Sequence, residues 1–118
     1  MPSDVRIVTQ HHQCQQHVVE LDKAIQTLEQ RPAAYVVGPR HGQYLYKGSA
    51  RNLVERLKDH RAGRVSRTKN NRPLILYYYK YFFDYDTAHK QELFLKSGQG
   101  RNWLKAQLKT GADCSAEG

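Results

Sequence analysis

The amino-acid sequence predicts one small domain of the α/β type, more narrowly α+β, in which helices accompany a β-hairpin and a further strand. Residues 33–47 hold two short β-prone runs joined by a loop, and residues 74–83 form a longer apolar and aromatic run. Apolar residues recur at helical spacing on both sides of these runs. The 118 residues are the usual size of a single domain.

An amphipathic helix is expected near the N-terminus, from about His11 to Gln30, followed by Pro32, which would end it. Its apolar stripe follows spacings of three, four and three residues. The stripe either covers one side of the core or, because the spacing also fits a heptad, joins two chains in a homodimer. We therefore expect a helical extension at 1–32, the main domain at 33–109 and a flexible tail at 110–118. The stripe consists of Val18, Leu21, Ile25 and Leu28.

The two β-prone runs, Ala33–Val37 and Tyr44–Lys47, predict a hairpin closed by a loop rich in glycine and proline. If the loop closes symmetrically, Tyr35 faces Tyr46 across the ladder with β-carbons about 5 Å apart. Both hydroxyls are then expected on the side of the domain that carries Arg56.

A helix should follow the hairpin, capped by Ser49 and ending near Arg61. Two leucines form its buried seam. At 100° per residue, Arg56 and His60 fall beside that seam, one turn apart. The two side chains could therefore line a cleft at the edge of the sheet.

The second half of the chain predicts a strand and two helices. Leu74–Phe83 is apolar or aromatic on both alternating faces, which favours a central strand covered on both sides. Asp86 could cap a helix at Thr87–Lys96, in which Glu92 shares a face with apolar residues. A last short helix is expected at Arg101–Lys109, with its tryptophan docked on the core.

The net charge of +8 is concentrated in one part of the chain. Residues 39–73 hold ten basic and two acidic residues, so this segment alone accounts for the excess. Such a field suits a polyanion such as nucleic acid, although it could also be a solvated face. Residues 64–72 form a basic loop without apolar period. The candidate nucleic-acid contacts are Lys47, Arg51, Arg61, Arg64, Arg67 and Lys69.

Other classes of protein are disfavoured. No run of about 18 apolar residues or signal-like N-terminus is present, so we expect a cytoplasmic protein without membrane association. Cys14 and Cys114 are expected to be free thiols. A zinc site is disfavoured, because the residues that could bind zinc lie on one polar stretch rather than on two elements. These are His11, His12, Cys14 and His17.

Five polar residues are predicted to converge: Tyr35, Tyr46, Arg56, His60 and Glu92. Phosphodiester hydrolysis needs an activated water, a cation that polarises the phosphate, and donors that stabilise the developing charge. A carboxylate suits Mg²⁺, a guanidinium suits phosphate, and an activated tyrosine can act as a base. Each residue also has a structural interpretation: tyrosine packing, an Arg56–Glu92 ion pair, or a histidine at a helix dipole.

The sequence resembles the GIY-YIG nuclease superfamily, especially its small stand-alone bacterial members. The resemblance rests on Ala33-Ala34-Tyr35-Val36-Val37, on the run from Tyr46-Lys47-Gly48 to His60, and on Ala88–Lys96. The two tyrosines stand eleven residues apart, as the motif expects. Departures are Ala33-Ala34 in place of Gly-Ile, and Lys47 in place of isoleucine.

This resemblance implies a three-stranded antiparallel sheet flanked by helices, one divalent metal ion (Mg²⁺ or Mn²⁺) and cleavage of DNA. Tyr35 and Tyr46 match the two motif tyrosines, Arg56 the catalytic arginine, His60 the helix histidine and Glu92 the metal ligand. The sequence therefore favours a metal-dependent endonuclease, with RNA left open as a substrate. The alternatives are a catalytically weak nucleic-acid-binding module, which a targeting partner could direct, and an interaction protein that dimerises.

Overall fold

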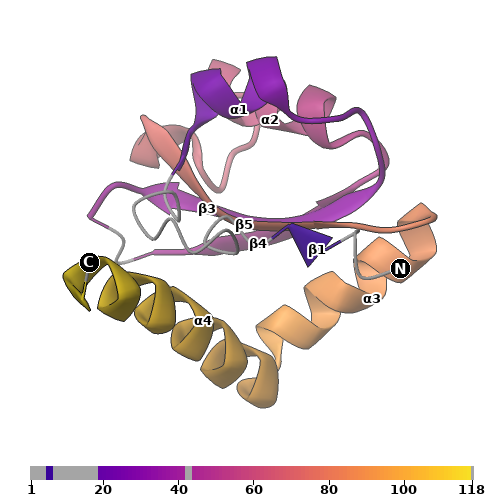
Figure 1. Ribbon diagram of the computed structural model, residues 1–118. Coiled ribbons are helices and arrows are strands. Elements are labelled where there is room, and N and C mark those ends of the chain that lie inside the picture. Colours follow the sequence, from indigo (N-terminus) through magenta and orange to yellow (C-terminus); the bar gives the residue numbers. More distant parts are fainter. Residues whose placement is uncertain (1–4, 7–18, 42–43, 118) are drawn as a thin grey trace.

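A single sheet separates two layers of helices (Figure 1). The computed structural model describes residues 5–6, 19–41 and 44–117, with side chains over 19–41 and 44–108. Helices α1 (Leu21–Thr27) and α2 (Leu53–Ala62) cover one face, and α3 (Tyr85–Lys96) and α4 (Gly98–Glu117) cover the other. The predicted α+β class is therefore confirmed.

The three predicted strands form the main part of an antiparallel sheet. Strand β3 (Ala33–Pro39) lies between β4 (Tyr46–Ala50) and β5 (Leu74–Tyr81). Two further strands of two residues each, β1 (Val5–Arg6) and β2 (Val19–Glu20), both pair with β5. Strand β5 pairs with β3 and with both short strands, so it lies inside the sheet as expected, and β3, whose first six residues are all buried, lies beside it.

The hairpin has a longer loop and a different register than predicted. Tyr35 pairs with Gly48, and Tyr46 pairs with Val37, so the register differs by two residues from the expected Tyr35–Tyr46 pair. Because side chains alternate with a period of two, a shift of two residues leaves both tyrosines on the same face. The ladder between β3 and β5 carries a bulge after Val36, but the ladder between β3 and β4 is regular.

The helix caps also differ from the prediction. Asn52, not Ser49, caps α2 by accepting from the backbone N–H of Glu55. Asp84, not Asp86, caps α3 by accepting from the N–H of Thr87. Serine, asparagine and aspartate are about equally good N-caps. The sequence alone therefore could not decide between Ser49 and Asn52, or between Asp84 and Asp86. Because α2 begins only at Leu53, Ser49 stays on β4 and its hydroxyl is available for another contact.

The N-terminal helix is much shorter than expected. Helix α1 has seven residues, and Val19–Glu20 belong to a strand instead. Leu21 is buried, and Ile25 and Leu28 pack against the same core, so the described part of the stripe covers the core. Residues 7–18, which include Cys14 and the three histidines that could bind metal, lie outside the described residues, as does the Cys114 side chain.

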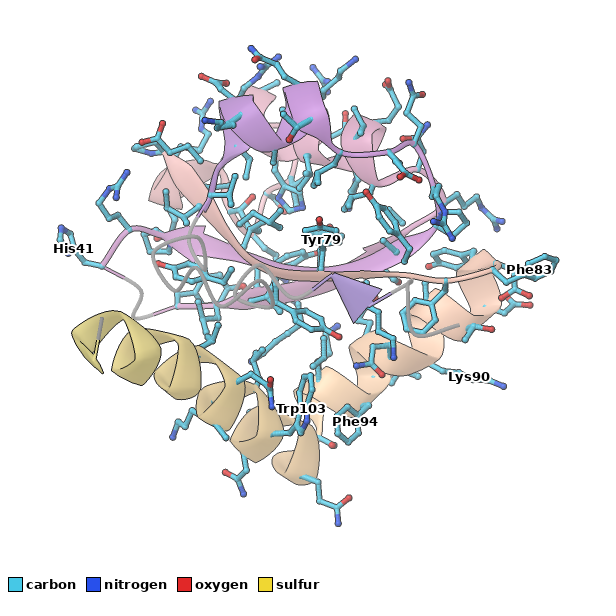
Figure 2. The ribbon with its side chains drawn as sticks, viewed as in Figure 1. His41, Tyr79, Phe83, Lys90, Phe94 and Trp103 are labelled. Carbon is cyan, nitrogen blue, oxygen red and sulfur yellow. The ribbon has the colours of Figure 1, made fainter. Side chains whose placement is uncertain are left out.

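Two hydrophobic clusters hold the layers together. One joins α1 and α2 to the sheet through residues that include Leu21, Leu53 and Leu57. The other lies beneath α3 and α4, where Trp103 packs edge-on against Tyr78 and Phe94 (Figure 2). The docking of the last helix is thus confirmed. That helix begins at Gly98 and continues to Glu117, through most of the segment expected as a tail.

The basic segment between α2 and β5 is anchored more firmly than a simple loop. It contains a short 3₁₀ turn, η3 (Lys69–Asn71). Val65 and Thr68 are buried, whereas Arg64, Arg67 and Lys69 are exposed. In the part of the chain that the structure describes, no helix is long and apolar enough to cross a membrane.

Candidate active site

The two tyrosines of the hairpin meet on the face that carries α2. Their ring centroids are 6.3 Å apart. Gly48 makes this arrangement feasible, since a Cβ at that position would lie only 2.5 Å from the Tyr35 hydroxyl. Tyr35 is fully buried and lies across the glycine, whereas Tyr46 remains partly exposed. Of the two tyrosines, Tyr46 is therefore the one that solvent can reach.

His60 reaches the same place from the last turn of α2. Its Nε2 lies 2.8 Å from the Tyr35 hydroxyl, and its Nδ1 lies 2.9 Å from Thr68 Oγ1. The imidazole also packs edge-on against both tyrosine rings. His60 is 0% exposed, and burial together with the charge of Arg56 lowers its pKa to about 4. The imidazole is therefore neutral at neutral pH.

Arg56 lies one turn before His60 and is partly exposed. Its guanidinium is within hydrogen-bonding reach of both Tyr35 and Tyr46, and it forms a 3.6 Å ion pair with Asp59. Burial and the neighbouring Tyr46 raise the pKa of Tyr35, while the hydrogen bond from Arg56 lowers it. Burial is the largest cause and keeps Tyr35 protonated.

Glu92 approaches from the opposite face of the sheet. Ser49, which alternates with Gly48 on β4, donates from its hydroxyl to Glu92 Oε1 at 2.6 Å. Lys96 Nζ lies 2.6 Å from the other carboxylate oxygen. Glu92 is therefore paired, and its ion-pair partner is Lys96 rather than Arg56, the structural alternative considered from the sequence.

Strand β4 is the edge strand that brings these two groups together. It presents Tyr46 and Gly48 on one face and Ser49 on the other. The negative charge of Glu92 is close enough to raise the pKa of Tyr35, as the smallest of its causes. The five candidate residues thus surround one edge of the sheet.

A group of cations lies beside Glu92 on the face of α3 and α4. Lys47 of β4, Lys96 and Arg101 are near one another, and burial together with the charges of Arg101 and Lys96 lowers the pKa of Lys47. Arg101 also donates to the backbone carbonyl of Lys96 at 2.8 Å. Mutual repulsion among these cations favours an anionic ligand. Lys96 and Arg101 were not among the residues predicted to contact nucleic acid.

The other predicted contact residues are spread over the surface. Arg51 stacks on the ring of Tyr85, 4.7 Å from its centroid. Arg64 pairs with Asp59 at 2.9 Å, and Arg67 and Lys69 are exposed on the segment that follows α2.

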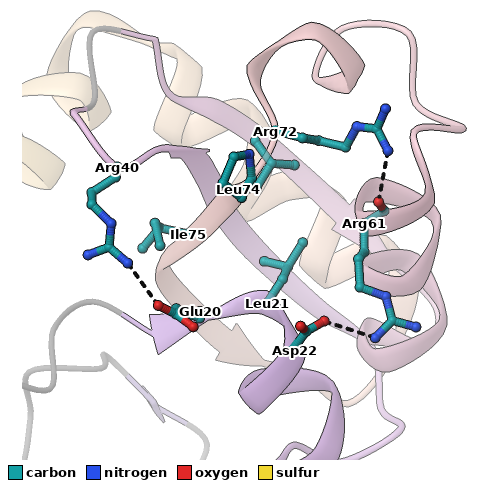
Figure 3. Close-up of a pocket in the computed structure, with 9 residues that line it drawn as sticks. Glu20, Leu21, Asp22, Arg40, Arg61, Arg72, Leu74 and Ile75 are labelled. Atoms are coloured by element: carbon teal, nitrogen blue, oxygen red, sulfur yellow. Dashed lines mark hydrogen bonds and ion pairs between the residues drawn. The ribbon is translucent and has the colours of Figure 1, made fainter.

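Arg61 points to a different part of the molecule. It lines a pocket beside β2 and the start of β5, where it pairs with Asp22 at 3.0 Å (Figure 3). Arg40 pairs there with Glu20 at 2.8 Å. None of the five candidate catalytic residues lines this pocket. Its charges largely balance, so the pocket is a weaker place for a polyanion than the tyrosine edge.

Four residues beside the site were not predicted from the sequence: Ser49, Thr68, Lys96 and Asp59. Ser49 was taken for a helix cap, and Thr68 stands between basic residues in a segment without apolar periodicity. Lys96 carried one signal, since its position four residues after Glu92 is the favourable spacing for an ion pair on a helix. Thr68 carried none.

Comparison with known proteins gives one match, to a family model. A sequence model of the GIY-YIG catalytic domain matches residues 31–105, which is more than half of the chain. Searches of curated proteins and of solved structures found no match. The matched range contains every residue that forms the edge site.

Proposed function

The chain belongs to the GIY-YIG family, and we propose that it is a divalent-metal-dependent endonuclease that hydrolyses DNA phosphodiester bonds. One observation carries the proposal: Tyr46 lies on the edge strand β4, Arg56 of α2 reaches Tyr46, and Glu92 of α3 is bonded to Ser49 of the same strand. A partly exposed hydroxyl, a guanidinium and a carboxylate are the groups that phosphodiester hydrolysis requires in one place. Tyr35 and His60 lie buried behind them.

The donor set fits one Mg²⁺ or Mn²⁺ ion. Among the described residues, no group of three histidine, cysteine or acidic side chains lies together, as zinc would require. Mg²⁺ instead uses one or two carboxylates and keeps several waters, so Glu92 alone suffices. When bound, the ion would polarise the phosphate and neutralise charge in the transition state. The cost of binding includes displacement of Lys96 from the carboxylate.

Between the two tyrosines, we assign the role of general base to Tyr46. Tyr35 is fully buried, its pKa is raised by burial, and its hydroxyl is engaged by His60. Tyr46 is partly exposed and has the guanidinium of Arg56 beside it. The Tyr46 hydroxyl would accept a proton from the attacking water. His60, neutral and buried, would position Tyr35 rather than contact the substrate.

Arg56 would hold the scissile phosphate. Its guanidinium can offer two parallel N–H donors to phosphate oxygens, which a lysine cannot reproduce. On the other side of β4, Lys47, Lys96 and Arg101 would bind neighbouring phosphates of the same strand. DNA would thus cross the edge of the sheet, with RNA as a further candidate because these contacts do not read the sugar.

A nucleic-acid-binding module with little turnover is the second candidate, and the Glu92–Lys96 contact favours it. Both oxygens of Glu92 are engaged by Ser49 and Lys96, which opposes metal binding. In that case the chain would bind DNA and depend on a partner for activity or targeting.

Cleavage assays distinguish the two candidates. Supercoiled plasmid and branched DNA, incubated with purified protein and Mg²⁺ or Mn²⁺, should be nicked by the wild type and not by Tyr46→Phe. Tyr44→Phe is the matched control, since Tyr44 is an exposed tyrosine on the same hairpin. Metal-dependent nicking that survives in Tyr46→Phe would contradict the assignment of the base. Binding without nicking by the wild type would favour the module.

A further inference from the structure

A line of hydrogen bonds connects Thr68 to the candidate site through His60. Thr68 Oγ1 lies 2.9 Å from His60 Nδ1, and His60 Nε2 lies 2.8 Å from the Tyr35 hydroxyl. All three side chains are 0% exposed. Because buried polar groups must find partners within the protein, every hydrogen on this line needs an acceptor there.

One arrangement of protons satisfies the whole line. If His60 carries its proton on Nδ1, it donates to Thr68 Oγ1, and the Thr68 hydroxyl donates to the Val65 carbonyl at 3.4 Å. Nε2 then has a free lone pair, which accepts the Tyr35 hydroxyl proton. The Tyr35 oxygen in turn accepts from Arg56, whose guanidinium has only donors. Each hydrogen bond in this series is therefore donated in the direction from Arg56 to the Val65 carbonyl, and every donor meets an acceptor.

The opposite tautomer breaks the series. A proton on His60 Nε2 would donate to the Tyr35 oxygen and turn the Tyr35 hydroxyl proton toward Arg56. The Tyr35 hydroxyl proton and an N–H of Arg56 would then face each other, two donors with no acceptor between them. Such a mismatch in a buried network costs more than in water, because the low dielectric strengthens every electrostatic contact.

We propose that Thr68 is a positioning residue that holds His60 in its Nδ1–H tautomer and thereby fixes the orientation of Tyr35 and Arg56. The catalytic consequence of this role rests on the function proposed above, whereas the tautomer itself does not. Thr68 does not touch the substrate. His60 and Tyr35 lie between Thr68 and Arg56, the nearest group on this line that would touch the substrate.

The backbone around Thr68 is built to hold its hydroxyl in place. The N–H groups of Thr68 and Lys69 both donate to the Val65 carbonyl, and Asn71 N–H donates to the Thr68 carbonyl. Val65 is buried beneath the turn. The basic segment after α2 therefore has two sides: exposed cations toward solvent, and one buried threonine toward the site. This explains why an apparent surface loop carries two buried residues.

Nitrogen NMR of imidazole-labelled protein reads the tautomer directly, because protonated and unprotonated ring nitrogens resonate in different regions. His60 can be assigned through its contacts with the Tyr35 and Tyr46 rings. The other charged groups that face it are Arg56 and Asp59. We expect protonated Nδ1 and unprotonated Nε2 in the wild type and in Thr68→Ser. Thr68→Val, which keeps the shape but removes the acceptor, should shift His60 toward the Nε2–H form.

Cleavage kinetics supply the second measurement. Thr68→Val should lower kcat by about 10- to 100-fold through misorientation of Arg56, and Thr68→Ser should restore it. Thr68→Ala removes the hydroxyl without placing a methyl group against the imidazole, and it replaces Thr68→Val if that variant does not fold. A wild-type His60 protonated on Nε2, or an unchanged tautomer in both variants that lack the hydroxyl, overturns the proposal. Absence of cleavage by the wild type would contradict the proposed function while leaving the tautomer result intact.

Discussion

The ring of Tyr35 lies directly over Gly48, the residue opposite it on β4. A methyl group at Gly48 would come within 2.5 Å of the tyrosine hydroxyl and 2.6 Å of the ring carbon that carries it. Both atoms belong to a buried side chain whose hydroxyl is bonded to His60, so neither can move aside without loss of that bond. A glycine in this strand therefore serves the site rather than the sheet.

We expect Gly48→Ala to remain folded but to lose about 1–3 kcal/mol of stability from overpacking. Cleavage should fall more than stability, because Tyr35 must leave its position between His60 and Arg56. Gly98→Ala is the control, since nothing lies within 4 Å of a Cβ at that position. Thermal unfolding and nicking rates, measured on both variants, test this. A Gly48→Ala protein with wild-type activity would contradict the close packing.

The buried His60 should make stability depend on pH. Its pKa is lowered from 6.5 to about 4 in the folded protein, so the unfolded chain binds more protons between these values. Its contribution is complete above pH 6.5 and is lost as the pH falls toward 4, with a size of about 3 kcal/mol. Denaturant unfolding at pH 7, 5.5 and 4.5 should show this fall. His60→Gln should flatten the curve in the same window, and an equal slope in both proteins would argue against a buried neutral imidazole.

The sequence predicted the fold class, the shared face of the two tyrosines and the inward position of His60, because all three follow from side-chain periodicity. Alternation placed Tyr35 and Tyr46 on one face even though the predicted register was wrong by two residues. Helical spacing placed His60 inward in the same way.

The features that the sequence did not predict depend on contacts between distant segments. Whether Ser49 caps a helix or bonds to Glu92 is decided by the docking of α3 on the edge strand. Thr68 has the local pattern of a solvated loop, and only the position of His60 gives it a role. Short-range patterns hold no information about either pairing.

The exposed cations after α2 should contribute to DNA affinity through counterion release. Replacing Arg67 and Lys69 with alanine, while Thr68 is kept, should weaken binding and flatten the plot of log affinity against log salt by about 0.9 per lost phosphate contact. Stability should change by less than about 0.5 kcal/mol, since both side chains are exposed. Lys90→Ala is the control, because Lys90 points away from the molecule on α3 (Figure 2). An unchanged slope would assign the two cations to a solvated face.

Glu92→Gln tests the carboxylate. The amide has the same shape and can still accept from Ser49, so we expect a loss of stability of no more than about 1 kcal/mol, the value of a partly exposed ion pair. Metal-dependent cleavage should nevertheless fall by several orders of magnitude, and DNA affinity should hold or rise as a negative charge is removed. Glu55→Gln removes an exposed carboxylate that is also paired with a lysine. This control should change neither metal-dependent cleavage nor DNA affinity. A stable Glu92→Gln protein that cleaves at the wild-type rate would rule out Glu92 as a metal ligand.

Lys96 offers the complementary test, because its ammonium occupies one side of the Glu92 carboxylate. Lys96→Met keeps most of the side-chain length and removes the charge, so Glu92 has one competitor fewer for a divalent cation. If the ion pair is worth about 1 kcal/mol, Mn²⁺ should bind about fivefold more tightly. Titration followed by electron paramagnetic resonance measures this without DNA. Binding of DNA in the absence of metal should weaken in the same variant, since Lys96 also belongs to the cation group with Lys47 and Arg101. Tighter Mn²⁺ binding that persists in the Glu92→Gln Lys96→Met double variant would place the metal elsewhere.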